Sequence, residues 1–418
     1  MSFAHGMIGP SSDELDAGRG RIIRGMANLD YRTAGESHGR ALVVLVEGLP
    51  AGLRIDPLEI DAELRRRQGG YGRSGRMALE HDHVRILSGL RNGVTIGSPL
   101  AMEIENRDCR IDQAPPVHRP RPGHADFAGA MKWLTTDCRS TLERASARET
   151  AARVAAGAAA TALLREFAVD VVGYVVQIGE VKTFVAEPAT ADELRAARAA
   201  NEVYSVDQAA AQEMIAAIRR AKEDQDTLGG VVEVRVFNLP PGIGSCAQWQ
   251  GKLNGRLMGA VGAIQAIKGV EIGLGFGCAE CLGSQVHDEI DYRAAQRDQN
   301  NLGFVRRSNN AGGLEGGMTN GMPLVVRAAM KPISTLGRGL DSVNLETLRP
   351  ERSDHERSDI CAAPAASVVV QNVAAFEVAR AWLEKFAGDT IAEVRAAFEF
   401  YMASARSLAV PDQPSTDV

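Results

Sequence analysis

The stretch "SARETAARVAAGAAATALLREF", Ser146 to Phe167, indicates the fold class. Its many alanines favour a helix, and side chains this small let another element pack closely against it. A valine-rich segment from Val169 to Val176 follows at once and is typical of a buried strand. The order predicts a helix packed on a sheet.

The same alternation of helix and strand continues on both sides of this stretch. Upstream, Ala41 to Val46 is predicted to be a buried strand, and Asp56 and Pro57 supply an N-cap and a first-turn proline for a helix through Arg67. Downstream, we predict helices at Val206–Lys222, Lys252–Ile267, Pro364–Phe386 and Thr390–Ala403, and strands at Val231–Phe237 and Pro323–Met330. We therefore expect an α/β protein with helices packed on sheet throughout.

Two segments echo each other. "VEGLPAGL" (Val46 to Leu53) and "VFNLPPGI" (Val236 to Ile243) both end a strand with Leu-Pro-x-Gly. One interpretation is a duplicated unit with two similar sheets, and the other is chance similarity between turns that end strands.

Composition limits the class of function. The 418 residues carry a net charge of -6 and only 5% aromatics, whereas nucleic-acid binders need basic charge and, for single strands, aromatic platforms. No run reaches the length of apolar residues that a membrane span needs, and the N-terminus has no apolar signal core. We expect a cytoplasmic protein that binds neither nucleic acid nor a membrane.

The ends of the chain and its cysteines suggest no further chemistry. Residues 1–27 lack apolar periodicity and read as a flexible extension, 28–405 as a single catalytic domain and 406–418 as a flexible tail. Cys278 and Cys281 form one C-x-x-C, without the second pair of ligands that a zinc site needs. No metal is predicted.

Two basic clusters indicate an anionic ligand. "RRRQGGYGRSGR", residues 65–76, has five arginines, four glycines and no acid, so either it binds an anion or it forms a solvated basic surface. In "HRPRPGHADF", residues 118–127, two prolines restrict the backbone that presents Arg119, Arg121 and His124. Rigidly presented basic groups suit an anionic substrate.

Two further motifs lie near predicted helix starts. In "RASARET", Ser146 and Glu149 have capping-box spacing, so a helix begins at Ser146 with Arg144 and Arg148 beside its positive end. In residues 351–359, Glu-Arg-Ser-Asp occurs twice, and an Arg and an Asp two apart on an extended chain face one side. The second pair, Arg357 and Asp359, is preferred over Arg352 and Asp354 because it is nearer to the helix that Pro364 begins.

Glycines surround the remaining motifs. Five of them between Gly312 and Gly321 exclude a regular element and predict a loop that either holds a ligand or lets chains cross closely; the next strand ends in "KPIST". In "TAGESHG", Ser37 and His38 lie between two glycines that let the loop bend around a ligand. P-loop, Rossmann and G-x-S-x-G motifs are missing. The residues alone thus indicate an α/β enzyme for a small, multiply anionic ligand.

The chain resembles the chorismate synthases over about Asp30 to Ala403, through segments that occur in the same order: "GESHG", "RPGHAD", "RASARETAARVAAG", "IKGVEIG", "AGGLEGGMTNG" and "KPIST". The resemblance implies a β-α-β sandwich, in which helices pack with two antiparallel-type sheets, and a homotetramer. It implies a lyase that eliminates phosphate from 5-enolpyruvylshikimate 3-phosphate to give chorismate. Reduced FMN would be its cofactor, with NADPH as a candidate reductant.

The resemblance also assigns roles to residues. His38 would protonate the departing phosphate, His124 would stabilise the reduced flavin anion, and Asp359 would relay a proton, with Ser37 as a fourth catalytic residue. Flavin would contact Arg144, Ala145, Ser146, Gln265, Ala266, Gly316, Lys331, Pro332, Ile333, Ser334, Thr335 and Arg357. Arg67 and Arg73 match positions for the substrate or the pyridine nucleotide.

Two other functions fit the basic loops. A phosphotransferase or phosphatase would use the arginines as clamps without a redox cofactor and would depend on magnesium. A module that binds nucleic acid or another anion would lose affinity steeply with salt.

Overall fold

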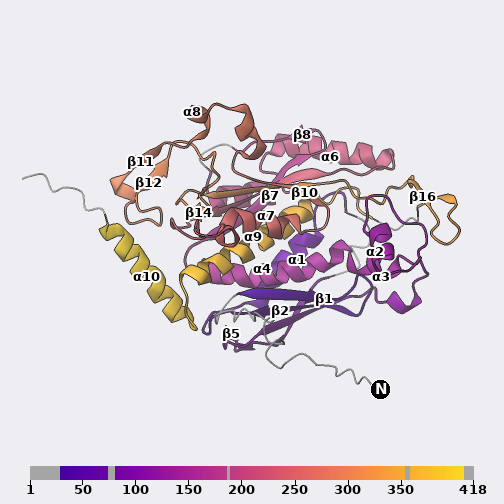
Figure 1. The fold of residues 1–418 in the computed structure, drawn as a ribbon, viewed down its shortest axis with the longest axis horizontal. Helices are drawn as coiled ribbons and strands as arrows, with labels where there is room; N and C mark the ends of the chain where they lie inside the picture. Colours follow the sequence, from indigo (N-terminus) through magenta and orange to yellow (C-terminus); the bar gives the residue numbers. More distant parts are fainter. Residues whose placement is uncertain (1–28, 74–80, 186–188, 354–357, 409–418) are drawn as a thin grey trace, which may run out of the picture.

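The computed structural model describes residues 29–73, 81–185, 189–353 and 358–408. Two antiparallel sheets enclose a layer of helices (Figure 1). The first sheet has the order β1-β2-β6-β3 and the second β10-β15-β9-β7-β8. Their strands are β1 (Asp30–Ala34), β2 (Ala41–Glu47), β3 (Val84–Ser88), β6 (Leu100–Glu105), β7 (Asp170–Ile178), β8 (Val181–Lys182), β9 (Gly230–Phe237), β10 (Ile267–Ile272) and β15 (Leu324–Met330).

Four helices contribute to the layer between the sheets, where α4 contacts β2 and α9 contacts β7 and β9. These are α1 (Pro57–Gln68), α4 (Thr150–Arg165), α7 (Leu253–Gly262) and α9 (Ala363–Lys385). The remaining helices are α2 (Asp126–Lys132), α3 (Arg139–Arg144), α5 (Ala191–Ala199), α6 (Gln208–Glu223), α8 (Gly283–Val286) and α10 (Ile391–Ser407). The expected sandwich of helices between two antiparallel sheets is confirmed.

Small residues bring the central elements close together. A Cβ added to Gly157 of α4 would lie 2.2 Å from the carbonyl oxygen of Asn372 on α9, and one added to Gly173 of β7 would lie 2.5 Å from that of Ser367. Such distances leave no room for a side chain, so α9 fits between α4 and the second sheet only because these positions are glycine. The alanine-rich helix is where the sequence predicts it, although a 3-10 turn precedes Thr150.

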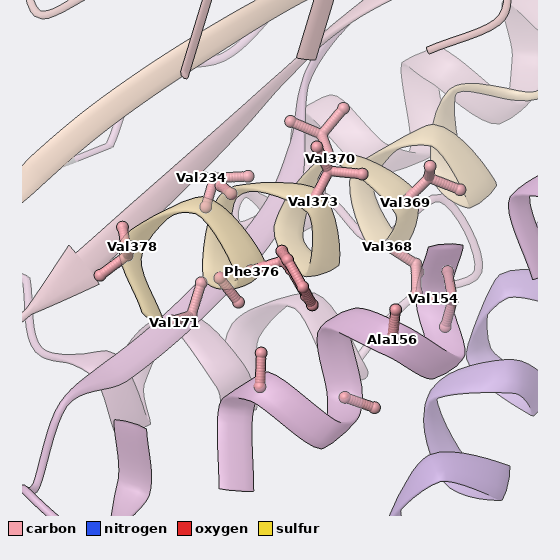
Figure 2. Packing of buried hydrophobic residues seen from close by; sticks show 14 of the residues in the cluster. Val154, Ala156, Val171, Val234, Val368, Val369, Val370, Val373, Phe376 and Val378 are labelled. Atoms are coloured by element: carbon pink, nitrogen blue, oxygen red, sulfur yellow. The ribbon is translucent and has the colours of Figure 1, made fainter. Parts of the chain in front are cut away.

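The core around α9 is built from valines and alanines. Figure 2 shows Val171 and Val234 of the second sheet and Ala156 of α4 beside α9. Phe376 of α9 is 1% exposed and meets the ring of Tyr31 edge-on, with 4.6 Å between centroids. Each such buried side chain contributes about 1.5–3 kcal/mol, so α9 anchors both sheets.

The two sheets repeat one topology. In chain order, β1, β2, α1, β3, β6 and α4 correspond to β7, β9, α7, β10, β15 and α9, and each set of four strands pairs in the order first, second, fourth, third. All these pairs are antiparallel. The Leu-Pro-x-Gly segments follow β2 and β9, the corresponding second strands. The shared topology favours duplication over chance.

Two predicted segments differ from the structure. The helix expected to reach Ile267 ends at Gly262, because Ala266 takes a left-handed φ of 68° and β10 begins directly after it. The glycine-rich segment is a short hairpin, since Gly316 and Gly317 have φ of 61° and 91° and turn the chain as a two-residue loop requires. Its strands are β13 (Leu314–Glu315) and β14 (Met318–Thr319).

The remaining strands form short pairs outside the sandwich. They are β4 (Leu90–Arg91) with β5 (Val94–Thr95), β11 (Ile290–Tyr292) with β12 (Phe304–Arg306), and β16 (Asp341–Val343) with β17 (Pro350–Arg352). Helix α10 includes the first residues of the expected tail, and residues 409–418 and 1–28 lie outside the described part. Within the described residues, no helix combines the length and hydrophobicity needed to span a membrane.

Candidate functional site

A cavity of about 580 Å³ opens between the two halves of the chain. Its walls are the ends of α1 and α7, the segments that precede α4 and α9, and the first turns of these two long helices. Most of the site residues expected from the sequence line it: Ser37, His38, Arg67, Arg73, His124, Ala145, Ser146, Gln265, Ala266, Lys331, Pro332, Ile333, Ser334, Thr335 and Asp359.

Three expected residues are not part of this wall. Arg144 is exposed and donates to the carbonyl oxygens of Thr33 (3.2 Å) and Gly35 (3.3 Å), so it braces the β1–β2 turn. Gly316 borders a separate hollow of about 250 Å³ beside α7. Arg357 lies outside the described residues.

The structure describes part of the doubled Glu-Arg-Ser-Asp motif. Asp359 lines the cavity and accepts a hydrogen bond from Arg73 at 2.5 Å, so its described partner comes from the segment after α1. Arg352 is an exposed residue of β17 whose guanidinium lies 3.4 Å from Asp341. Asp354 is outside the described residues.

His38 lies in the tight turn between β1 and β2 and is 8% exposed. Its Nδ1 lies 2.9 Å and 3.0 Å from the two carboxylate oxygens of Glu143, and its backbone N–H donates to the same carboxylate at 2.8 Å. Burial raises the pKa of Glu143, but the hydrogen bonds and charge of His38 outweigh it, with help from Arg139, and the net shift is downward. Glu143 is therefore an anion that holds this imidazole.

The glycines of this turn have a structural reason within the chain. A Cβ on Gly35 would lie 2.4 Å from the carbonyl oxygen of Ala41, and one on Gly39 would lie 2.8 Å from the carboxylate of Glu36. The amide of Asn106 donates to the carbonyls of Glu36 (3.0 Å) and Gly39 (2.8 Å). The turn carries Ser37 and His38 into the cavity wall, and its bending around a ligand stays a prediction.

His124 is held by a second carboxylate. Its Nδ1 contacts Asp126, which is fully buried and also accepts from Nε of Arg121 at 2.8 Å. Burial raises the pKa of Asp126, but hydrogen bonds from His124 and Arg121 lower it well below the ordinary aspartate range. Arg121 also donates to Thr335 at 3.2 Å and so joins this loop to the strand end of the second half.

Two arginines share one buried aspartate. Asp82 is 1% exposed and accepts from Arg148 at 2.6 Å and 2.8 Å and from Arg67 at 3.1 Å. Burial lowers the pKa of Arg67 to about 10; Asp82 opposes this shift, while Arg148 and Arg73 add to it. The pair of guanidinium groups keeps positive charge at the cavity wall.

The second half of the chain adds an apolar part of the cavity wall. Ala263, Ile264, Met330 and Pro332 give it apolar character, and Nζ of Lys331 donates to the carbonyl oxygen of Gly123. Burial, with some repulsion from Lys268, lowers the pKa of Lys331.

Gln265 has an acceptor available for a ligand. Its Nε2 donates to the carboxylate of Glu149 at 3.0 Å, which fixes the amide because a carboxylate only accepts. The Oε1 atom is buried and has no protein partner. Glu149 also accepts from Thr33 (2.6 Å) and Arg153 (2.9 Å). The expected capping box is therefore half formed: Ser146 caps the turn, but Glu149 does not reciprocate.

The walls carry surplus positive charge. Five basic side chains line the cavity, Arg67, Arg73, Arg121, Arg148 and Lys331, and the carboxylates that pair with them are Asp82, Asp126 and Asp359. The described residues hold no cluster of three or more His, Cys, Asp or Glu side chains arranged to bind a metal. Such a cavity suits an organic ligand with several negative charges.

The sequence did not identify the buried carboxylates that pair with the two histidines and with Arg148. Asp126 was within reach, because it stands two residues after His124 in the quoted motif. Glu143 is 105 residues from His38, and Asp82 is 66 residues from Arg148. No local pattern in one sequence reveals such pairs.

Comparisons with known proteins identify the family of the chain. The model of the chorismate synthase family matches residues 29–383. The chorismate synthase of Desulforudis audaxviator is 54% identical over 378 residues, which is 88% of this chain and 95% of that protein. That of Geobacter sulfurreducens is 50% identical over 392 residues, covering 91% and 100%. A chorismate synthase crystal structure aligns with a TM-score of 0.75 at 41% identity, covering 91% of this chain and 99% of that one.

Proposed function

Because the chain belongs to the chorismate synthase family, we propose that it converts 5-enolpyruvylshikimate 3-phosphate to chorismate and phosphate by an anti 1,4-elimination that requires reduced FMN. It is then a carbon-oxygen lyase of aromatic amino-acid biosynthesis. The observation that carries the proposal is the convergence of His38, His124, Ser146 and Lys331, from four separate segments, on one cavity.

The cavity fits both ligands by chemistry. The surplus of guanidinium groups suits a substrate with one phosphate and two carboxylates, since arginine matches both groups in a bidentate fork. The small apolar residues of the second half suit a flat ring system, and the unpartnered Oε1 of Gln265 suits an N–H donor.

FMN would be held by Ala145, Ser146, Gln265, Ala266 and the segment Lys331 to Thr335. When bound, reduced FMN supplies the electron density that lets the C–O bond to phosphate break and the C6 hydrogen leave.

The protein's own groups bind anions and move protons. Arg67 and Arg73 bind the substrate's negative groups, and Arg148 adds charge beside them. His38, with Nδ1 held by Glu143, donates a proton from Nε2 to the departing phosphate. His124 supplies positive charge beside the flavin, and Asp359 accepts and passes on a proton, with its carboxylate steadied by Arg73. Ser37 receives a hydrogen bond from Ser146 at 3.2 Å, which orders both hydroxyls at the wall.

The family resemblance further supports a homotetramer in the cytoplasm, with NADPH as a candidate reductant of the flavin. Mass photometry tests the assembly.

Anaerobic turnover tests the reaction. Purified protein with chemically reduced FMN and the phosphorylated substrate should release phosphate and chorismate in equal amounts, and omission of FMN should abolish both. Phosphate release that needs magnesium but not flavin would overturn the proposal in favour of a phosphatase.

A further inference from the structure

His38 is tied to one short helix through three separate contacts. Glu143 of α3 accepts from the ring Nδ1 and from the backbone N–H of His38, and its own carbonyl accepts from the N–H of Ser37 at 3.1 Å. The Glu143 side chain has no exposed surface, whereas that of His38 is 10% exposed. The carboxylate therefore lies behind the ring and away from any ligand.

The charged groups around the ring are of mixed sign. Glu143 faces Nδ1, and Asp108, from the segment after β6, lies 3.7 Å from Nε2. Arg139 lies 3.4 Å from Glu143, and Arg110 lies 3.0 Å from Asp108. The two carboxylates are the charged groups nearest to the ring nitrogens, and each of the two arginines pairs with one of these carboxylates.

We propose that Glu143 is a positioning residue for His38, which fixes the ring with Nδ1–H toward α3 and Nε2 toward the cavity. This inference rests on the proposed function, because the direction of Nε2 matters only if a leaving phosphate takes a proton from it. A carboxylate can accept from Nδ1–H but cannot donate to Nδ1, so it selects this tautomer.

Glu143→Gln tests the orientation of the ring. A carboxylate only accepts a hydrogen bond, whereas a glutamine amide can turn either to accept from Nδ1–H or to donate to Nδ1. In the protein without substrate, at a pH where the ring is neutral, NMR of ¹⁵N-labelled imidazole should place the proton of His38 on Nδ1 in the wild type and show both tautomers in Glu143→Gln. Asp126→Asn is the matched control: it should change the tautomer populations of His124 and leave those of His38 unchanged. Unchanged tautomer populations of His38 in Glu143→Gln overturn the proposal.

Turnover provides a second readout. In Glu143→Gln, kcat should fall while KM for the substrate changes little, because Glu143 orients the imidazole and does not contact the substrate. Adding Glu143→Gln to His38→Ala should have no further effect on kcat, because the residue acts through the imidazole. A further loss in the double variant would mean that Glu143 has another role.

The design tolerates two failures. If Glu143→Gln does not fold, Glu143→Asp keeps a carboxylate behind the ring at a longer distance, so it should keep the proton of neutral His38 on Nδ1 and lower kcat; a mixture of both tautomers in this variant contradicts the proposal. The NMR measurement needs no turnover, so failure of the lyase assay would contradict the proposed function and still leave the positioning of His38 measurable.

Discussion

The two halves of the chain build the cavity from corresponding elements. In the first half, the end of α1 contributes Arg67, and the segment before α4 contributes His124. In the second half, the segment after α7 contributes Gln265, and the segment before α9 contributes Asp359. The same topology thus places residues from the same two corresponding positions on either side of one ligand site.

The halves differ most in the link between their first two strands. In the first half, a tight turn between β1 and β2 carries Ser37 and His38 into the wall. In the second, the link between β7 and β9 contains β8, α5 and α6, and none of its described residues lines the cavity. The first half supplies both histidines and the carboxylates that bind them, whereas the second half supplies mainly an apolar part of the cavity wall. The shared fold sets the positions of the site residues, and the links between its strands determine which catalytic side chains reach the site.

The sharpest test of this division is a pair of substitutions, one in each half. His38→Ala should lower kcat by about 10²- to 10⁴-fold, because a positioned acid contributes that much, and should leave FMN affinity unchanged. Ser334→Ala should change kcat less than tenfold. Anaerobic kinetics and flavin titration measure both. Equal losses of kcat in the two variants would break the distinction.

The buried carboxylate of the first half should also control acid stability. The pKa of Asp126 is depressed in the folded protein, so its stabilisation is complete at neutral pH and is lost as the pH falls below about 3.9, where the unfolded side chain takes up a proton. Asp126→Asn should lower the free energy of unfolding at pH 7 by about 3 kcal/mol and flatten its fall below pH 4. Urea unfolding across pH 3–7 measures this; a parallel fall in both proteins would argue against it.

The contact between the halves can be tested at one glycine. Gly157→Ala should destabilise the protein by about 1–3 kcal/mol, because the added methyl overlaps the backbone of α9. Gly259→Ala is the control in α7, where an added Cβ meets nothing within 4 Å; it should stabilise the protein by about 0.5–1 kcal/mol. If both variants were stabilised, α4 and α9 would not be in contact as described.

The smallest effect is expected at the surface of the second half. Gln265→Met removes the buried acceptor that lacks a partner and also the hydrogen bond from Nε2 to Glu149, so the free energy of unfolding should fall by about 1–2 kcal/mol, while FMN affinity should fall about threefold to tenfold, the value of one hydrogen bond. Fluorescence titration measures the affinity. Unchanged affinity would show that Oε1 does not face the flavin.

Local signals in the sequence predict much of the fold. Asp56 caps α1 as expected, with its carboxylate accepting from Leu58 N–H at 2.9 Å, because N-capping depends on a few adjacent residues. The predicted end of α7 was wrong. Apolar residues continue to Ile267, but the helix ends at Gly262 and the backbone turns at Ala266 before β10 begins. Periodicity reports burial, not this change of φ.

The site was predictable through resemblance and hardly otherwise. His38 and His124 could be named from their motifs, but the partner of His38 could not, because Glu143 reaches it only in the folded chain, as Asp82 reaches Arg148. The glycines show the same limit. The motif predicts a tight bend at Gly35 but does not show that the backbone of Ala41 in β2 lies against it. One sequence shows which residues are unusual, but not what each of them touches.

Asp82 has a consequence for the protein before any reaction. A single carboxylate serves two guanidinium groups that are 4% and 6% exposed, so two positive charges repel each other beside the cavity. A polyvalent anion that enters the cavity should relieve this repulsion and, by binding only the native state, stabilise the folded protein. Inorganic phosphate alone should therefore raise the melting temperature, and chloride at the same ionic strength should do so much less.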